Sequence, residues 1–113
     1  NNIEAENHIA QAIALSKEIK NHKHNQYLFY LTIADYYFFK EEYSISLVYA
    51  KKIIKLNPTD FDALLKIGDL YFNMEEYATA KEYYSKVKDY YEGTEEAKYA
   101  EENIRECNEL EGR

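Results

Sequence analysis

The chain repeats itself with a period of 34 residues. When residues 27–60 are laid over residues 61–94, ten positions carry the same residue. The identical pairs are Leu31/Leu65, Ile33/Ile67, Asp35/Asp69, Tyr37/Tyr71, Phe38/Phe72, Glu41/Glu75, Glu42/Glu76, Tyr43/Tyr77, Tyr49/Tyr83 and Lys52/Lys86. A fixed period of roughly 20–50 residues is the signature of repeat architectures, in which each copy buries its apolar face against a neighbour. We therefore expect a stack of similar units.

The spacing within each copy predicts two helices. Apolar or small residues recur at steps of three and four, which places them on one helical face. In the first helices they are Tyr30, Ile33, Ala34 and Tyr37, and Leu64, Ile67, Gly68 and Tyr71; in the second helices they are Ser46, Ala50 and Ile53, and Ala80, Tyr84 and Val87. A sheet protein needs turn residues between its strands, and this chain has only three glycines and one proline. The fold is therefore expected to be all-α.

Six helices are expected, over about residues 3–21, 26–40, 43–56, 60–74, 77–91 and 95–110. Asn57–Pro58 ends the third helix, because a proline disfavours the helical conformation in the residue before it. Thr59 or Asp60 can cap the fourth helix, and Thr94 can cap the sixth. In the sixth helix an apolar stripe replaces the strict 34-residue register, and it consists of Ala97, Ala100, Ile104, Cys107 and Leu110.

The two copies resemble the tetratricopeptide repeat family. That family's pattern is a large residue, a Leu-Gly pair and a Tyr, followed in the second helix by a small residue and an aromatic one, and then by Pro. The second copy matches it at Leu64, Ile67, Gly68, Tyr71, Ala80 and Tyr84, and the first at Tyr30, Ile33, Ala34, Tyr37, Ser46 and Pro58. Ala50 departs from the pattern in place of the aromatic residue, and Glu92 in place of the proline.

The resemblance implies a right-handed α-solenoid of antiparallel helix hairpins. We expect one tetratricopeptide-like domain over residues 1–113. Residues 1–26 would be the second helix of a partial preceding repeat, residues 27–60 and 61–94 two full repeats, and residues 95–113 a capping helix. A polar outer face on a terminal helix keeps the last apolar surface of a solenoid from solvent.

The charge distribution excludes some partners. The formal net charge is −7, and the excess lies in the C-terminal half: residues 61–94 carry seven acidic residues against four lysines. Nucleic-acid binding requires a basic face, so no nucleic-acid partner is expected. No segment reaches the roughly 18 apolar residues of a membrane span. The single cysteine favours a reducing compartment such as the cytoplasm, and the start at Asn1 leaves a periplasmic or other extracytoplasmic location open, because a targeting segment could precede it.

The candidates for chemistry are few. Cys107 lies on the apolar stripe with no histidine near it in sequence, which favours a buried structural cysteine. His8, His22 and His24 lack the partners of a recognised metal-ligand spacing. The pairs Glu41–Glu42 and Glu75–Glu76 recur at the repeat period, which indicates a structural turn. We expect no enzyme activity, no cofactor and no metal.

The expected function is a protein–protein interaction module or scaffold. The resemblance implies a concave face lined by the first helix of each copy, and this face would bind a peptide or amphipathic helix with apolar anchors and basic residues. The candidate partner-binding residues are Leu28, Leu31, Asp35, Phe38, Phe39, Leu65, Lys66, Asp69, Phe72 and Asn73. Phe38 and Phe72 have a competing interpretation as packing residues.

Two other interpretations follow from the same residues. Some tetratricopeptide modules bind acidic chaperone tails through a clamp of basic residues, but Asp35 and Asp69 occupy matching places here, so that clamp is not supported. The alternative function is a structural or self-associating segment of a larger tetratricopeptide protein. The apolar face of the N-terminal helix would then form a homo-oligomer, as in an assembly component of a bacterial envelope.

Overall fold

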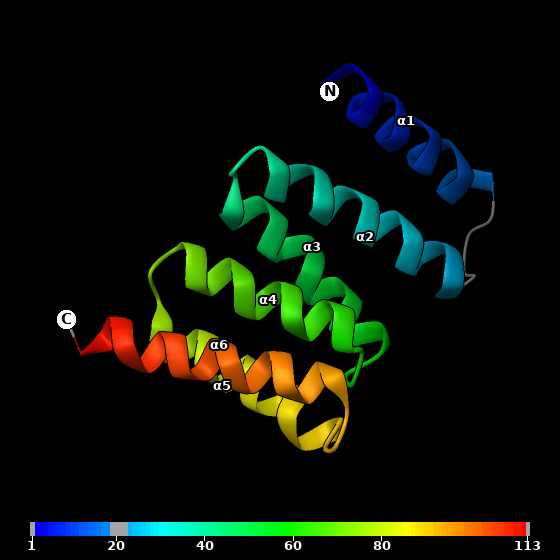
Figure 1. Cartoon of the computed structure of the whole chain (residues 1–113). Helices are drawn as coiled ribbons and strands as arrows, with labels where there is room; N and C mark the ends of the chain where they lie inside the picture. Colours follow the sequence, from blue (N-terminus) through cyan, green and yellow to red (C-terminus); the bar gives the residue numbers. More distant parts are fainter. Residues whose placement is uncertain (1, 19–22, 113) are drawn as a thin grey trace. The chain divides into compact units, whose positions relative to one another are not determined.

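The computed structural model describes residues 2–18 and 23–112, and every regular element in these ranges is a helix (Figure 1). The six helices are α1 (Asn2–Glu18), α2 (Lys23–Phe39), α3 (Tyr43–Leu56), α4 (Phe61–Asn73), α5 (Tyr77–Tyr90) and α6 (Glu95–Glu111). The predicted all-α fold with six helices is confirmed. Among the described residues no helix has the length and apolar character needed to cross a membrane.

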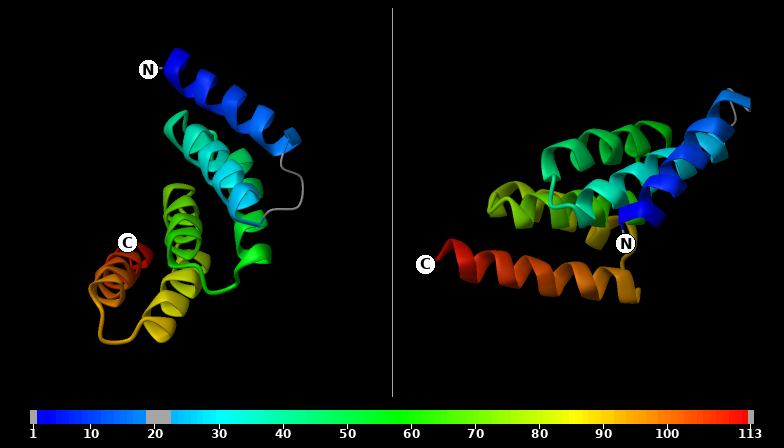
Figure 2. Two further views of the ribbon diagram at one scale, coloured as in Figure 1. Left: turned by 90° about the vertical axis from the view of Figure 1, so that its right-hand side faces the viewer. Right: turned by 90° about the horizontal axis from the view of Figure 1, so that it is seen from above.

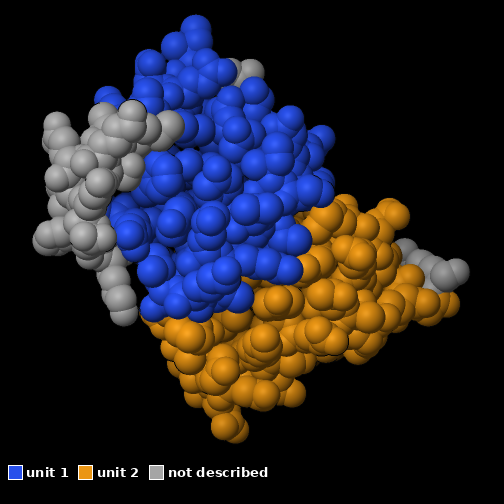
Figure 3. All heavy atoms as spheres, turned by 180° about the vertical axis from the view of Figure 1, so that it is seen from behind, with its two compact units in different colours: residues 1–56 blue, residues 57–113 orange. Residues whose placement is uncertain are grey.

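The chain forms two compact units, residues 1–56 and residues 57–113 (Figure 3). Unit 1 contains α1, α2 and α3, and unit 2 contains α4, α5 and α6. Inside each unit, consecutive helices pack side by side in antiparallel pairs, and α6 also contacts α4 (Figure 2). The extent of a single domain over the whole chain stays a prediction.

The helix ends follow the predicted signals. The Asp60 carboxylate accepts a hydrogen bond from the backbone N–H of Ala63 at 3.0 Å, so Asp60 rather than Thr59 caps α4. The Thr94 hydroxyl accepts from the N–H of Ala97 at 3.3 Å and caps α6. Each cap satisfies a backbone donor that has no partner inside the first turn of its helix. Helix α3 ends at Leu56, two residues before Pro58.

The repeated glutamate pairs form the same turn in both copies. Glu41 and Glu75 adopt left-handed φ values of 60° and 62°. The N–H of Glu42 reaches the carbonyl of Tyr37 at 2.9 Å, and the N–H of Glu76 reaches that of Tyr71 at 2.9 Å. This bond closes the last helical carbonyls in the manner of a Schellman motif, whose left-handed position is usually glycine. The predicted turn role of these pairs is confirmed.

Most of the core lies on the predicted faces, and Ala63 and Leu70 of α4 are buried in addition. Ile33, Ala34, Leu64, Ile67 and Gly68 are buried on the first helices, and Ser46, Ala50, Ile53, Ala80, Tyr84 and Val87 are buried on the second helices. In α6 the buried residues are Ala97, Ala100 and Cys107, which confirms the apolar stripe over the strict register. The tyrosines Tyr30, Tyr37 and Tyr71 are half-buried.

A compensating exchange explains why the copies differ at the helix crossing. In unit 2 a Cβ atom at Gly68 would lie 2.7 Å from Cε1 of Tyr84, so only glycine leaves room for that ring. In unit 1 the same two positions hold Ala34 and Ala50, both fully buried. The second copy therefore pairs a glycine with a large ring, and the first copy pairs two alanines. Both combinations fill the helix crossing, as close packing requires.

Candidate functional site

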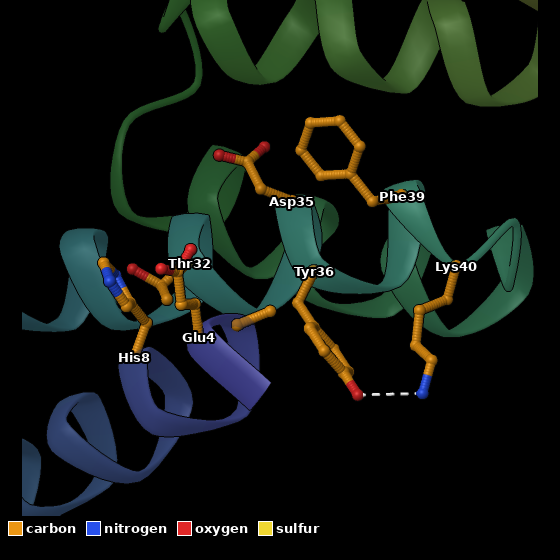
Figure 4. Close-up of a pocket in the computed structure, with 8 residues that line it drawn as sticks. Glu4, His8, Thr32, Asp35, Tyr36, Phe39 and Lys40 are labelled. Carbon is orange, nitrogen blue, oxygen red and sulfur yellow. Dashed lines mark hydrogen bonds between the residues drawn. The ribbon is translucent and has the colours of Figure 1, made fainter. Parts of the chain in front are cut away.

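In unit 1 a groove of about 530 Å³ lies between α1 and α2 (Figure 4). We call it the α1–α2 groove. Its lining residues come from one half of each helix, and they are Glu4, Ala5 and His8 of α1 together with Thr32, Asp35, Tyr36, Phe39 and Lys40 at the end of α2. The volume falls in the range of about 300–1,000 Å³ that is typical of ligand pockets.

The groove has a floor and two rims. Thr32 and Tyr36 belong to the α2 floor, and Glu4 and His8 rise from α1 along one side. Asp35 and Phe39 point to the opposite side of α2, as Figure 4 shows. Because residues four apart on a helix share a face, the spacing of Asp35 and Phe39 sets a carboxylate and a phenyl ring one turn apart.

A short hydrogen-bonded chain fixes the end of the groove near the α2 C-terminus. The ammonium of Lys40 donates to the Tyr36 hydroxyl at 2.9 Å, and that hydroxyl donates to the Glu6 carboxylate at 3.4 Å. The hydrogen bond with Tyr36 raises the pKa of Lys40. The same ammonium lies 5.0 Å from the centre of the Tyr36 ring, in cation–π range. These contacts connect α1 to α2 at the rim.

The structure brings together two of the predicted partner-binding residues of unit 1 in this groove. Asp35 and Phe39 line it, and the Phe39 side chain is 85% exposed. Leu28 is 45% exposed on the same helix, and Leu31 is half-buried. Phe38 packs edge-on against Tyr43 at 5.8 Å between ring centres, so it serves the hairpin between α2 and α3.

On the equivalent face of α4 in unit 2, several of the predicted partner-binding side chains make contacts within the unit. Phe72 meets Tyr77 edge-on at 5.4 Å, which repeats the contact of Phe38 with Tyr43. The amide of Asn73 donates to the carbonyl of Asp69 at 2.8 Å within α4. Leu65 and Lys66 are half-buried. Their role in partner binding stays a prediction.

Asp69 accepts a hydrogen bond from a tyrosine, and the first copy has no tyrosine at the equivalent position. The Tyr84 hydroxyl donates to the Asp69 carboxylate at 2.5 Å. Burial raises the pKa of Asp69, while the Tyr84 hydrogen bond and the charge of Lys66 act in the opposite direction. Burial and the nearby Asp69 carboxylate also raise the pKa of Tyr99 in α6. In unit 1 the place of Tyr84 is taken by Ala50, whose methyl group cannot donate a hydrogen bond to Asp35.

Sequence reasoning missed six of the eight lining residues. They are Glu4, Ala5, His8, Thr32, Tyr36 and Lys40. The contributions of α1 follow from antiparallel packing, which sets the start of α1 beside the end of α2. The i, i+4 spacing of Glu4 and His8 was the available signal, since it places both side chains on one face.

The remaining candidates for chemistry do not converge. Cys107 is fully buried, as predicted, and burial raises the pKa of its thiol, which opposes formation of a reactive thiolate. Within residues 2–18 and 23–112, no three or more His, Cys, Asp or Glu side chains gather in a way that could hold a metal ion. His8 and His24 are exposed, and His22 lies outside the described residues.

Comparison with known proteins finds a repeat in the middle of the chain. A family model described as a tetratricopeptide repeat matches residues 49–82, from the second half of α3 through α4 into α5. Residues 49–82 therefore match a tetratricopeptide repeat. The resemblance predicted from the two copies is thereby confirmed. No curated protein shows significant similarity to the chain. Tetratricopeptide repeats generally mediate protein–protein interaction and are typically non-catalytic.

Proposed function

We propose that this tetratricopeptide chain is a non-catalytic interaction module that binds a peptide or amphipathic helix of a partner protein in the α1–α2 groove. The observation that carries the proposal is the exposed Phe39 on the rim of that groove. An exposed aromatic side chain beside a hollow supplies the anchor on which protein interfaces depend, because a few central aromatic residues carry most of their binding free energy.

The size of the effect follows from the apolar area. Burying a phenylalanine side chain stabilises a complex by about 1.5–3 kcal/mol. Each 1.4 kcal/mol changes an affinity tenfold. Phe39→Asp, which also introduces a charge that must be desolvated, is therefore expected to weaken partner binding by at least about tenfold.

The test is affinity capture from cells that produce the protein, followed by binding measurements on the purified partner. Wild type is compared with Phe39→Asp and with Val48→Asp. Val48 is 54% exposed on α3 and does not line the groove, so it controls for the same substitution at an exposed apolar residue. A partner that binds wild type and Val48→Asp equally and loses Phe39→Asp supports the proposal. Equal binding to all three proteins rejects it.

Self-association is the second candidate function. Ile3 at the start of α1 is 69% exposed, which offers an apolar contact for another copy of the chain. Multi-angle light scattering over a hundredfold range of concentration tests this candidate. A dimer that Ile3→Asp converts to a monomer supports it, and a monomer of the wild-type chain at the highest concentration removes it.

A further inference from the structure

We infer that the outward face of α3 binds the outward face of α6 in a second copy of this chain. The contact joins unit 1 of one molecule to unit 2 of the next. It uses neither the α1–α2 groove nor Ile3, so it is independent of both functions proposed above. Its basis is the charge and the spacing of exposed side chains on the two helices.

Helix α3 is basic in a chain whose net charge is −7, since it contains three lysines and no acidic residue. Exposed side chains three and four residues apart form a stripe along one face of the helix. Lys52 lies 5.8 Å from the centre of the Tyr30 ring, a contact that leaves its charge in place. Lys55 forms no ion pair with any described residue. This α3 stripe runs from apolar to basic and consists of Ile45, Val48, Lys52 and Lys55.

The packing of the repeat does not require the α3 stripe. Helix α5 has the same place in the second copy, and its inward face is buried as that of α3 is. The positions of α5 equivalent to the stripe hold a polar set in which two acids outnumber one lysine, namely Thr79, Glu82, Lys86 and Asp89. The apolar and basic character of the α3 stripe is therefore a property of the surface and not a condition for folding.

Helix α6 carries a stripe with the same spacing and the opposite charge. It contains seven acidic residues and two basic ones. The two cations, Lys98 and Arg105, lie to one side of the stripe, and Lys98 pairs with Glu95 at 3.3 Å. The glutamates of the stripe form no ion pair with any described residue. This α6 stripe is exposed and consists of Tyr99, Glu102, Glu106 and Glu109.

Complementary charge selects both the occupant and its direction. Two α3 stripes, or two α6 stripes, would bring like charges together, whereas α3 against α6 brings opposite charges together. In an antiparallel arrangement Lys52 would meet Glu102 and Lys55 would meet an aromatic ring, which leaves one ion pair. A parallel arrangement gives one apolar pair and two ion pairs. Its matched positions are Ile45 with Tyr99, Val48 with Glu102, Lys52 with Glu106 and Lys55 with Glu109.

The contact joins two different surfaces, so each bound pair of molecules keeps one unused α3 stripe and one unused α6 stripe. A heterologous contact of this kind produces open chains of molecules unless its rotation closes a ring. Exposed ion pairs are individually weak and are screened by salt. We therefore expect oligomers that grow with protein concentration and dissociate as the salt concentration rises.

The experiment is sedimentation velocity of the full 113-residue chain over a hundredfold range of concentration, at about 0.02 M and about 0.5 M salt. Lys52→Glu with Lys55→Glu makes both stripes acidic, and Glu106→Lys with Glu109→Lys gives both stripes a net positive charge. Each double variant should associate at least about tenfold more weakly than wild type at low salt. An equimolar mixture of the two should associate again, because each variant then meets a stripe of opposite charge.

Two features of the design separate the stripes from general effects of charge. Glu106→Lys with Glu109→Lys lowers the net negative charge of the chain, so general repulsion predicts stronger association where the stripes predict weaker association. Lys86→Glu is the matched control, because Lys86 lies 4.7 Å from the centre of the Tyr83 ring and so reproduces the cation–π contact of Lys52. It should leave association unchanged. Circular dichroism checks folding, and Lys55→Glu and Glu109→Lys alone replace any double variant that does not fold.

A wild-type chain that stays monomeric at low salt and at the highest concentration overturns the inference, even if it binds an acidic peptide of another protein. Association that the charge variants retain also overturns it, and so does a mixture that associates no more than its components. If Ile3→Asp abolishes association and the charge variants do not, the contact belongs to α1 and the α3 stripe is not an interface.

Discussion

The pair Gly68 and Tyr84 predicts a reversal in the effect of one mutation. An added Cβ at Gly68 would lie 2.7 Å from Cε1 and 3.0 Å from Cδ1 and Cζ of the buried Tyr84 ring. Overpacking of this kind costs about 1–3 kcal/mol. Alanine in place of glycine inside a helix contributes about 0.5–1 kcal/mol in the other direction. Gly68→Ala should therefore destabilise the wild-type chain by about 1–2 kcal/mol.

Removing the Tyr84 ring should reverse the effect of Gly68→Ala on the stability of the chain. Tyr84→Ala alone is expected to cost about 3–5 kcal/mol, as large aromatic truncations in a core do. In that background Gly68→Ala meets no ring, so only the gain in helix propensity remains, about 0.5–1 kcal/mol. The coupling between the two sites should be about 2 kcal/mol, which is within the range measured for residues in contact. The double variant reproduces the Ala34/Ala50 pair of the other copy.

The assay is urea unfolding followed by circular dichroism at 222 nm for the four proteins of the cycle. The same concentration of a stabilising osmolyte in all samples keeps the weakest variant folded. Gly112→Ala is the control, since a Cβ there would lie 3.5 Å or more from its neighbours. The close-contact reasoning is refuted if Gly68→Ala has the same effect with and without Tyr84, or if it stabilises the wild type.

Three further outcomes follow from the turns, the buried acid and the buried hydroxyl. Glu75→Gly should stabilise the chain by about 1 kcal/mol, because glycine adopts the left-handed φ of 62° without strain, whereas Glu76→Gly should not; thermal unfolding compares the two. Burial raises the pKa of Asp69 in the folded chain above its value in the unfolded chain, so the carboxyl group ionises first in the unfolded chain. The stability of the wild type should therefore fall relative to that of Asp69→Asn as the pH rises from about 4 towards 7. Urea titrations over that interval that show no change in this difference, or a rise, would contradict the prediction. Ser46→Ala should cost about 1 kcal/mol by removing the buried hydrogen bond to the Ala34 carbonyl at 2.6 Å, and an unchanged urea midpoint would exclude that role.

The helices and the core could be predicted because the repeat supplies each packing position twice. Ile33 and Ile67, or Ser46 and Ala80, agree in size and spacing, so the buried face was readable without a structure. The turn at Glu41 and Glu75 was readable for the same reason. The sequence did not decide whether Thr59 or Asp60 caps α4, because either side chain can accept a hydrogen bond from a backbone N–H. The backbone conformation selects Asp60.

The α1–α2 groove was harder to predict from the sequence, because identical residues in the two copies have different neighbours in the structure. Asp35 and Asp69 look equivalent along the chain, but the residue that decides their roles lies fifteen positions further on, as Ala50 in one copy and Tyr84 in the other. The contribution of α1 depends on contacts between residues about 30 apart, such as Glu6 with Tyr36. A repeat pattern predicts what recurs, and the α1–α2 groove includes residues of α1 that lie outside both copies.

The central claim is that partners bind unit 1 between α1 and α2. Nuclear magnetic resonance of the ¹⁵N-labelled chain, titrated with the binding segment of the captured partner, tests it most directly. We predict that the backbone amides that move are those of residues 4–8 and 32–40. Shifts confined to residues 65–73 of α4, with those of α1 and α2 unchanged, would contradict the claim.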